Sequence, residues 1–415
     1  MAEPHRVVVT GMGAITPLGV GADVTFKGLS SGQSGVRKIT TFDTTGMPVN
    51  YAGEVEEINP GAVLKRPTPD TRDRGLMMGW ISAAEALRQA GVVDAEDRCT
   101  SEKPLGAVIG SGLGPLDELQ YAYGCFWKTG WKAMRPTTVP RSMFNSYASQ
   151  LSIYFGLKGM THVVASACAS GAAAIGQGYQ FVKHGYADQL LVGGVDSALS
   201  HALFASWTNL RVLAKHEDPT KASRPFDRER RGLVLSESAA MLVLETEEHA
   251  KARGAEILGE ILGFGYSSDA EHLTKPDVAG QAAAMQRCLQ DARLNPIDVD
   301  YVNAHGTATK ANDETEAEAL SQVFGRRKQP LLVSSTKSML GHAMGASSAL
   351  EALVCLQSIR DQTVCPTINC DDPEFEDLGM DFVPHTARSC KLNVAISNSF
   401  GFGGGNFVLA IGGTR

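Results

Sequence analysis

The stretch VVASACASGAAAIGQG, residues 163–178, places a single cysteine, Cys168, between a short apolar run and a long run of small residues. The β-branched residues before it are typical of a buried strand, and the residues after it are typical of a helix. A thiol at a helix N-terminus lies at the positive end of the helix dipole, near unpaired backbone N–H groups. This setting predicts a lowered pKa and a reactive thiolate, with small neighbours that let a substrate approach.

The same alternation of strand-like and helix-like segments runs through the 415-residue chain. Near-continuous apolar runs bounded by glycine or polar residues predict strands buried on both faces, at 6–13, 105–112, 163–168, 189–196, 257–265, 301–307 and 331–338. Helices are predicted at 76–91, 169–185, 281–294 and 341–359. The last of these resembles the helix after Cys168 in composition and placement. We therefore expect a layered α/β protein with an internal duplication, divided into units 1–255 and 256–415.

Composition excludes several classes of protein. The net charge of −7 gives no support to nucleic-acid binding, which requires a basic face. The N-terminal residues show no secretory signal, and no apolar run approaches the length of a membrane-spanning helix. The eight cysteines are scattered without a CxxC pair, so we expect reduced thiols and a cytoplasmic location.

Two histidines follow predicted strands in glycine-flanked segments. His305 lies in YVNAHGTAT and His342 in SSTKSMLGHAMGA, at the expected start of a helix. A neutral imidazole can donate a hydrogen bond to a carbonyl or enolate oxygen and can relay protons, although a single histidine is more often a core residue. A two-histidine metal site is the weaker hypothesis, because no third ligand lies at ligand spacing. Lys337, among small and apolar residues, needs a partner, and Glu351 on the following helix could supply it.

The segment NSFGFGGGN, residues 398–406, predicts a flexible turn whose backbone N–H groups can point at an oxyanion. It lacks the ending and the strand-to-helix context of a phosphate-binding loop. Phe402, between two glycines, is either an ordinary hairpin aromatic or a mobile gate over an acyl pocket.

Four motifs in this order, SACASG, NAHGTAT, SSTKSMLGHAMGA and SNSFGFGGGN, closely resemble the β-ketoacyl-acyl carrier protein (ACP) synthases, especially the type II elongating enzymes. The likeness covers essentially the whole chain, including residues 223–245 and 365–369. It implies a duplicated thiolase-type α/β/α/β/α five-layer sandwich, usually a homodimer. It also implies that no metal or redox cofactor is needed, because the phosphopantetheine arm of the carrier protein delivers the substrate.

The resemblance also implies a mechanism. Cys168 would take an acyl chain from an ACP thioester, and the N–H groups of Cys168 and Phe402 would form the oxyanion hole. His305 and His342 would bind the malonyl-ACP thioester and promote its decarboxylation. The resulting carbanion would attack the acyl-cysteine in a Claisen condensation.

Other residues match the family's supporting and substrate-contacting positions. Lys337 and Glu351 would support His342, and Phe402 matches the family's gate. The residues expected to contact substrate are Thr307, Thr309, Leu113, Phe204, Asn398 and Phe400. Ser236 departs from the pattern, because the elongating enzymes commonly have a glycine there.

The sequence gives candidates for the partner-binding surface and leaves more than one pathway open. An acidic carrier protein needs a local basic patch, with candidates at Lys65, Arg66, Arg72, Arg74, Arg211, Lys215 and 228–231. A heterodimer with a chain-length-factor-like subunit stays open, and so does fatty-acid, polyketide or polyene synthesis.

Three other functions can be weighed against the condensing enzyme. A thiolase acting on coenzyme A esters would need a second cysteine in 398–406, which has none. A non-catalytic partner subunit would not be expected to keep the cysteine and both histidines. A cysteine hydrolase would need an Asp or Asn to orient a single histidine base.

Overall fold

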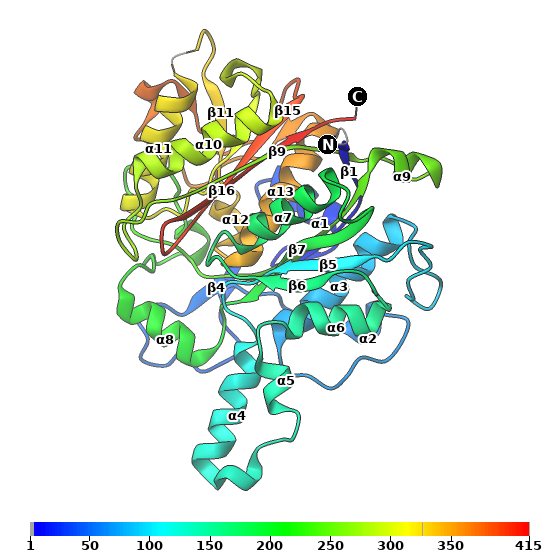
Figure 1. The fold of residues 1–415 in the computed structure, drawn as a ribbon. Helices are drawn as coiled ribbons and strands as arrows, with labels where there is room; N and C mark the ends of the chain where they lie inside the picture. Colours follow the sequence, from blue (N-terminus) through cyan, green and yellow to red (C-terminus); the bar gives the residue numbers. More distant parts are fainter. Residues whose placement is uncertain (1–3, 326, 415) are drawn as a thin grey trace.

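The computed structural model describes residues 4–325 and 327–414, and Figure 1 shows them from blue to red in chain order. The predicted absence of an N-terminal signal falls partly on residues 1–3, which lie outside the described residues. The main strands are β1 (Val7–Thr16), β5 (Gly106–Gly110), β6 (Thr161–Val164), β7 (Gln189–Ser197), β8 (Glu237–Thr246), β9 (Gly259–Ser268), β10 (Tyr301–Asn303), β11 (Leu331–Ser334), β13 (Met380–Asp381), β15 (Val394–Gly401) and β16 (Gly405–Gly412). The main helices are α1 (Ala22–Ser30), α3 (Arg74–Gln89), α4 (Leu116–Thr129), α5 (Thr138–Ser142), α6 (Ser146–Phe155), α7 (Ser170–Lys183), α8 (His201–Leu210), α9 (Glu247–Ala252), α10 (Val278–Ala292), α11 (Lys310–Phe324), α12 (Lys337–Leu340) and α13 (Gly345–Asp361). Within the described ranges, no helix is long and apolar enough to cross a membrane.

The order of the strands shows the internal duplication directly. In the first half the strands pair in the order β1, β8, β7, β5, β6, and in the second half in the order β9, β16, β15, β10, β11. In both halves the first two pairs are antiparallel and the last two are parallel. The halves join where β1 pairs with β9. The division between residues 255 and 256 falls between α9 and β9, and as a domain boundary it stays a prediction.

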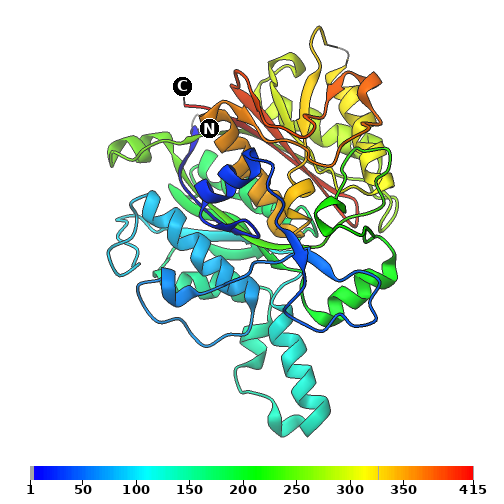
Figure 2. The same cartoon turned by 180° about the vertical axis from the view of Figure 1, so that it is seen from behind.

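Helices α7 and α13 pack against each other between the two half-sheets, and each touches strands of both halves. On the outer face of the first half-sheet lie α3 and α6, and on that of the second lies α10 with α11 beside it. Figures 1 and 2 show this arrangement from opposite sides. The five layers are those of the predicted thiolase-type sandwich.

Small residues let the two central helices approach closely. A Cβ atom at Gly171 in α7 would lie 2.6 Å from the carbonyl oxygen of Gly345 and 2.7 Å from the backbone nitrogen of Ala349 in α13. The backbone N–H of Ala172 donates to the Ser348 hydroxyl at 3.0 Å. This close contact at the two N-termini brings together the segments that precede the helices, which carry Cys168 and His342.

The predicted element bounds differ from the structure at both of these segments. The strand expected over 163–168 ends at Val164, and the helix expected from residue 341 begins at Gly345. His342 therefore lies in a turn and not in a helix. Its backbone is held by residues 234–236, because its N–H donates to the Val234 carbonyl at 2.7 Å and its carbonyl accepts from Ser236 at 3.0 Å. These bonds replace the hydrogen bonds that a helical residue would make.

Candidate active site

A cavity of about 280 Å³ contains the thiol and both imidazoles. Cys168 reaches it from the turn before α7, His305 from the end of β10, and His342 from the turn before α13. Phe400 and Phe402, from the end of β15 and the turn after it, also line the cavity. The structure thus brings the three predicted reacting side chains together from both halves of the fold.

A strained turn presents Cys168. Ala167 has a φ of +49°, in the left-handed region that a residue with a side chain rarely adopts. The Ser170 hydroxyl stabilises the turn, because it donates to the Ala167 carbonyl at 2.7 Å and accepts from the Ser166 N–H at 2.8 Å. The backbone N–H groups of Phe402 and of Cys168 itself lie close enough to the sulfur to favour its thiolate form. Two backbone N–H groups are therefore available beside the reacting atom.

The prediction of a lowered Cys168 pKa is wrong for this structure. The residue is only 5% exposed, and burial raises the pKa of the Cys168 thiol to about 11. The charge of Lys337 and the two N–H donors oppose this rise without overcoming it. The cysteine also precedes the first helical residue, Ser170, so the helix dipole acts from a greater distance. The thiol is therefore protonated in the resting site, and its attack on a substrate requires a proton acceptor.

The two imidazoles lie edge to face, with ring centroids 5.4 Å apart and an interplanar angle of 85°. Burial, together with the positive charge of Lys337, holds the pKa of His305 and His342 well below the usual value. Both rings are therefore neutral at physiological pH. His342 Nδ1 lies 3.2 Å from the Ser347 hydroxyl. His305 Nδ1 and His342 Nε2 are buried and have no hydrogen-bond partner among residues 4–325 and 327–414.

Lys337 and Glu351 form a buried ion pair behind the imidazoles. The lysine Nζ donates to a glutamate oxygen, and each side chain is only 2% exposed. Burial raises the pKa of Glu351 to about 7, although the charge of Lys337 opposes the shift. The predicted pairing of the two residues is confirmed. Within the described chain, Lys337 acts on the histidines through its charge, which lowers the pKa of both.

Glu316 holds the backbone of His305, and the sequence analysis missed it. Its two carboxylate oxygens accept from the N–H groups of His305 at 2.9 Å and Gly306 at 2.8 Å. The Asn398 amide donates to the same carboxylate at 3.2 Å. Asn398 is therefore placed behind the site, and it is not among the residues that line the cavity. The available signal was the spacing of Asn312 and Glu316, which puts two polar side chains on one face of α11.

Asp196 is a second missed residue, and it connects the two halves at the site. Its carboxylate accepts from the Ser111 hydroxyl at 2.6 Å and from the N–H of Gly112 at 2.8 Å in the first half. It also accepts from the N–H of Gly345, the first residue of α13, at 2.7 Å. Burial raises the pKa of Asp196 to about 6, and these donors oppose the shift. Its position at the end of a buried strand, in VGGVD, was the available signal.

The remaining predicted substrate contacts fall into two groups. Thr307 and Thr309 line the cavity, with their hydroxyl oxygens 2.8 Å apart. Leu113 and Phe204 do not line it, but they belong to the apolar cluster that surrounds Cys168. The cavity thus has both polar and apolar lining residues, and it adjoins the apolar cluster that contains Cys168.

Comparison with known proteins identifies the family. The chain matches the model of the beta-ketoacyl synthase N-terminal domain over residues 4–250, and that of the C-terminal domain over residues 258–371. It is 39% identical over 412 residues to the 3-oxoacyl-acyl-carrier-protein synthase 2 of Coxiella burnetii, with 99% of each chain covered. The chain belongs to the beta-ketoacyl synthase family. The predicted resemblance is confirmed, and this beta-ketoacyl synthase is an acyltransferase-class condensing enzyme.

Solved ketosynthases share the fold of this beta-ketoacyl synthase. The ishigamide ketosynthase/chain length factor superposes with a TM-score of 0.91 at 34% identity, covering 99% of this chain and 100% of that chain. A type II polyketide ketosynthase, solved with its acyl-carrier protein and the hexaketide, gives a TM-score of 0.88 at 27% identity, with both chains covered completely. The thiolase-type fold is therefore confirmed.

Proposed function

We propose that this beta-ketoacyl synthase holds an acyl chain on Cys168 and extends it with a malonyl unit delivered by an acyl carrier protein. In the first step the sulfur attacks the acyl thioester while a neutral imidazole accepts the thiol proton. The N–H groups of Cys168 and Phe402, which lie beside the sulfur, stabilise the oxyanion that forms on the thioester oxygen. The carrier leaves as a thiol with the transferred proton, so the acyl group changes only its thioester partner.

In the second step, the neutral histidines bind the malonyl thioester. Ring N–H groups of His305 and His342 donate to the thioester oxygen as carbon dioxide leaves and negative charge develops there. The enolate carbon then attacks the acyl-cysteine carbonyl, a carbon–carbon bond forms and the bond to sulfur breaks. The sulfur of Cys168 takes up one proton from solvent, which restores the resting thiol and balances the loss of carbon dioxide from the carboxylate. Lys337 and Glu351 position His342 and maintain its neutral form, and no metal or redox cofactor takes part.

One observation carries this proposal: a thiol and two neutral imidazoles share one cavity, with the backbone N–H groups of Cys168 and Phe402 beside the sulfur. Of the residues that line the cavity, all within the described chain, one is a cysteine. A thiolase would use a second cysteine as the acid and base at this place. The paired imidazoles therefore favour decarboxylative condensation over condensation of coenzyme A esters.

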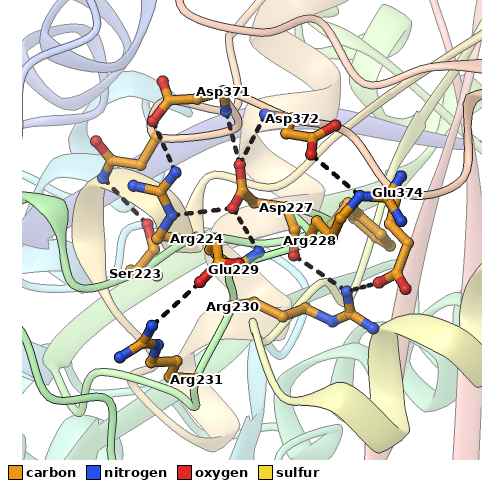
Figure 3. A network of polar contacts seen from close by, with 12 residues as sticks. Ser223, Arg224, Asp227, Arg228, Glu229, Arg230, Arg231, Asp371, Asp372 and Glu374 are labelled. Atoms are coloured by element: carbon orange, nitrogen blue, oxygen red, sulfur yellow. Dashed lines mark hydrogen bonds and ion pairs between the residues drawn. The ribbon is translucent and has the colours of Figure 1, made fainter.

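Several of the basic residues predicted to bind an acidic carrier protein already have partners within the chain. Figure 3 shows that Arg228 pairs with Asp372 and Arg231 with Glu229, while the buried Arg230 pairs with Glu374. Arg74 is likewise paired with Glu237, and Arg66 donates to backbone carbonyls. Of these predicted candidates, the buried Arg230 is unavailable for docking, and the others already have a partner within the chain.

Three exposed cations lie at the cavity, and Arg211 is the one among them that the sequence predicted; Lys65, Arg72 and Lys215 are also exposed but do not line the cavity. Lys275 lines it, Arg211 lies between the lining residues Leu210 and Val212, and Lys310 follows Thr309. None of them has an ion-pair partner within residues 4–325 and 327–414. We propose that these side chains receive the carrier protein and the phosphate of its phosphopantetheine arm.

A second chain is proposed to cover the lobe formed by α4 and α5, which projects from the first half in Figures 1 and 2. Large apolar side chains are exposed there, including Trp127 at 80% and Trp131 at 72%. Beside the lobe, β6 is the last strand of the sheet, and its outer edge has no strand partner in the described chain. A homodimer would cover both features, and a chain-length-factor-like subunit is the alternative partner.

The names of the relatives and the state of the cysteines bear on the pathway and the compartment. The full-length relative is named a 3-oxoacyl-acyl-carrier-protein synthase, and the solved neighbours are named for ishigamide and type II polyketide systems. We propose fatty-acid or polyketide-type synthesis in the cytoplasm. The eight cysteines are all free thiols, which supports a reducing compartment.

The decisive experiment supplies a panel of acyl-ACPs with malonyl-ACP and identifies the products by mass spectrometry. Cys168→Ala should abolish condensation, and Cys168→Gln should still decarboxylate malonyl-ACP because that step uses the histidines. Cys125→Ala, in the exposed helix α4, is the matched control and should condense normally. Full condensation by Cys168→Ala would show that the nucleophile is wrongly assigned.

A further inference from the structure

The ring of Phe402 is held by one aromatic neighbour, Trp207 of α8. The two rings stack with centroids 5.8 Å apart and an interplanar angle of 23°. Both line the cavity together with Cys168. Trp207 is only 8% exposed, whereas Phe402 is 39% exposed. The tryptophan is thus a fixed surface, and the phenylalanine lies against it from the cavity side.

The backbone around Phe402 permits the ring to move. Gly401 and Gly403 flank the residue, and Gly403 and Gly404 have φ values of +87° and +78°. The turn is tied to the segment 269–273 by two backbone bonds, from Gly403 N–H to the Leu273 carbonyl at 2.7 Å and from Asp269 N–H to the Gly404 carbonyl at 2.9 Å. These bonds hold the backbone of the turn, while the stack on Trp207 holds the side chain.

Trp207 also touches the place where an acyl chain would go. It belongs to the apolar cluster that contains Cys168, Leu199, Phe204 and Met344. Phe204 lies three residues earlier, on the same face of α8, where it is fully buried. Helix α8 therefore contributes two side chains: Phe204 lies inside the apolar cluster, and Trp207 contacts Phe402.

We infer that Trp207 is the latch of the Phe402 gate: it holds the ring closed over Cys168, and its stack must break before an acyl chain reaches the part of the apolar cluster around Phe204, which does not line the cavity. This inference rests on the proposed function of that cluster as the acyl site. Trp207 is a positioning residue, because it acts through Phe402 and not on the reacting atoms. An offset aromatic pair contributes enough to shift the open population about two- to tenfold.

The test measures how accessible the Cys168 sulfur is, without any carrier protein. The full-length protein is treated with iodoacetamide, and alkylation of Cys168 is followed by mass spectrometry of the cysteine peptide. Trp207→Leu should speed alkylation about two- to tenfold, and Trp207→Phe, which keeps an aromatic surface, should react close to the wild-type rate. In a Phe402→Leu background the Trp207→Leu change should have no further effect, because the stack is already lost.

Two results would overturn the inference: an unchanged alkylation rate in Trp207→Leu, or the same acceleration with and without Phe402. Acyl transfer from octanoyl-ACP to Cys168 should rise in parallel with alkylation. If alkylation responds as expected but the wild type does not condense, the latch stands and the proposed function fails. If the wild type condenses but the alkylation rate of Cys168 is the same in Trp207→Leu as in the wild type, only the latch inference fails.

Loss of Trp207 from a buried cluster could prevent folding, so a second measurement uses Phe402→Leu alone. Removing the ring uncovers one face of Trp207, and its fluorescence emission should shift to the red relative to the wild type. Trp207→Phe provides the reference spectrum without that tryptophan. An unshifted Trp207 emission in Phe402→Leu would overturn the inference.

Discussion

The contact between α7 and α13 gives the sharpest test of how the fold positions the site. A Cβ atom at Gly171 would lie 2.6 Å from a backbone oxygen and 2.7 Å from a backbone nitrogen of α13. Neither atom can move without its helix, so Gly171→Ala must push the helices apart. Overpacking of this kind costs about 1–3 kcal/mol. The gain of about 1 kcal/mol from replacing glycine in a helix offsets only part of this cost.

The same displacement should act on catalysis, because Cys168 and His342 precede the two helices directly. A misplacement of about 1 Å between reacting groups can cost about 100-fold in rate. We therefore expect Gly171→Ala to lose condensation more severely than its lowered melting temperature would suggest. Thermal unfolding followed by circular dichroism and the condensation assay at a temperature where the variant is folded measure the two effects.

Gly79 in α3 is the matched control. It is also a buried glycine inside a long helix, but its added Cβ would meet only Val195 Cγ2, at an ordinary contact distance of 3.7 Å. Gly79→Ala should therefore be stabilised by about 0.5–1 kcal/mol and keep full activity. The reasoning would be refuted if Gly171→Ala were as stable and active as Gly79→Ala.

Four further predictions concern the active site and the two proposed partner surfaces. Glu316→Ala leaves the two buried N–H groups of His305 and Gly306 unpaired, at about 1–3 kcal/mol each, so it should lower both the melting temperature and malonyl-ACP decarboxylation. Because the pKa of both histidines is held well below 6.5, the rings gain a proton only at more acidic pH, and decarboxylation by Cys168→Gln should show no fall as pH decreases through 6.5. Lys275→Glu should raise the KM for acyl-ACP, with no change for a short acyl-pantetheine thioester, and added salt should shrink the difference. Trp127→Glu should convert a dimer to a monomer in light scattering, and an unchanged mass would contradict the proposed interface.

The order of strands and helices could be predicted from the sequence because apolar runs and glycine positions are local signals. The same is true of the strand–cysteine–helix segment and of both histidine segments. The pKa of Cys168 could not be predicted, because it depends on how deeply the sulfur is buried by residues from both halves. The helix dipole is visible in a sequence, whereas the desolvation that opposes it is a property of the assembled cavity.

Pairings between distant segments account for the other differences. The sequence predicted that Arg230 could bind the carrier protein, but in the fold its guanidinium forms an ion pair with Glu374, which is far along the chain. Asn398 sits in a catalytic motif, yet its amide is directed to Glu316, and nothing local reveals this. The exposed lobe around Trp127 was not anticipated, because an apolar helix face is normally expected to be covered by the same chain.

Asp196 has a consequence for the order in which the molecule becomes competent. Its carboxylate joins Gly112, made early in synthesis, to Gly345, made late, across the middle of the molecule. The thiol leaves the ribosome well before either imidazole, still without a proton acceptor. A chain that ends before residue 305 therefore carries the thiol without either imidazole, and the contact between Gly345 and Asp196 is one of those that later bring His342 to it.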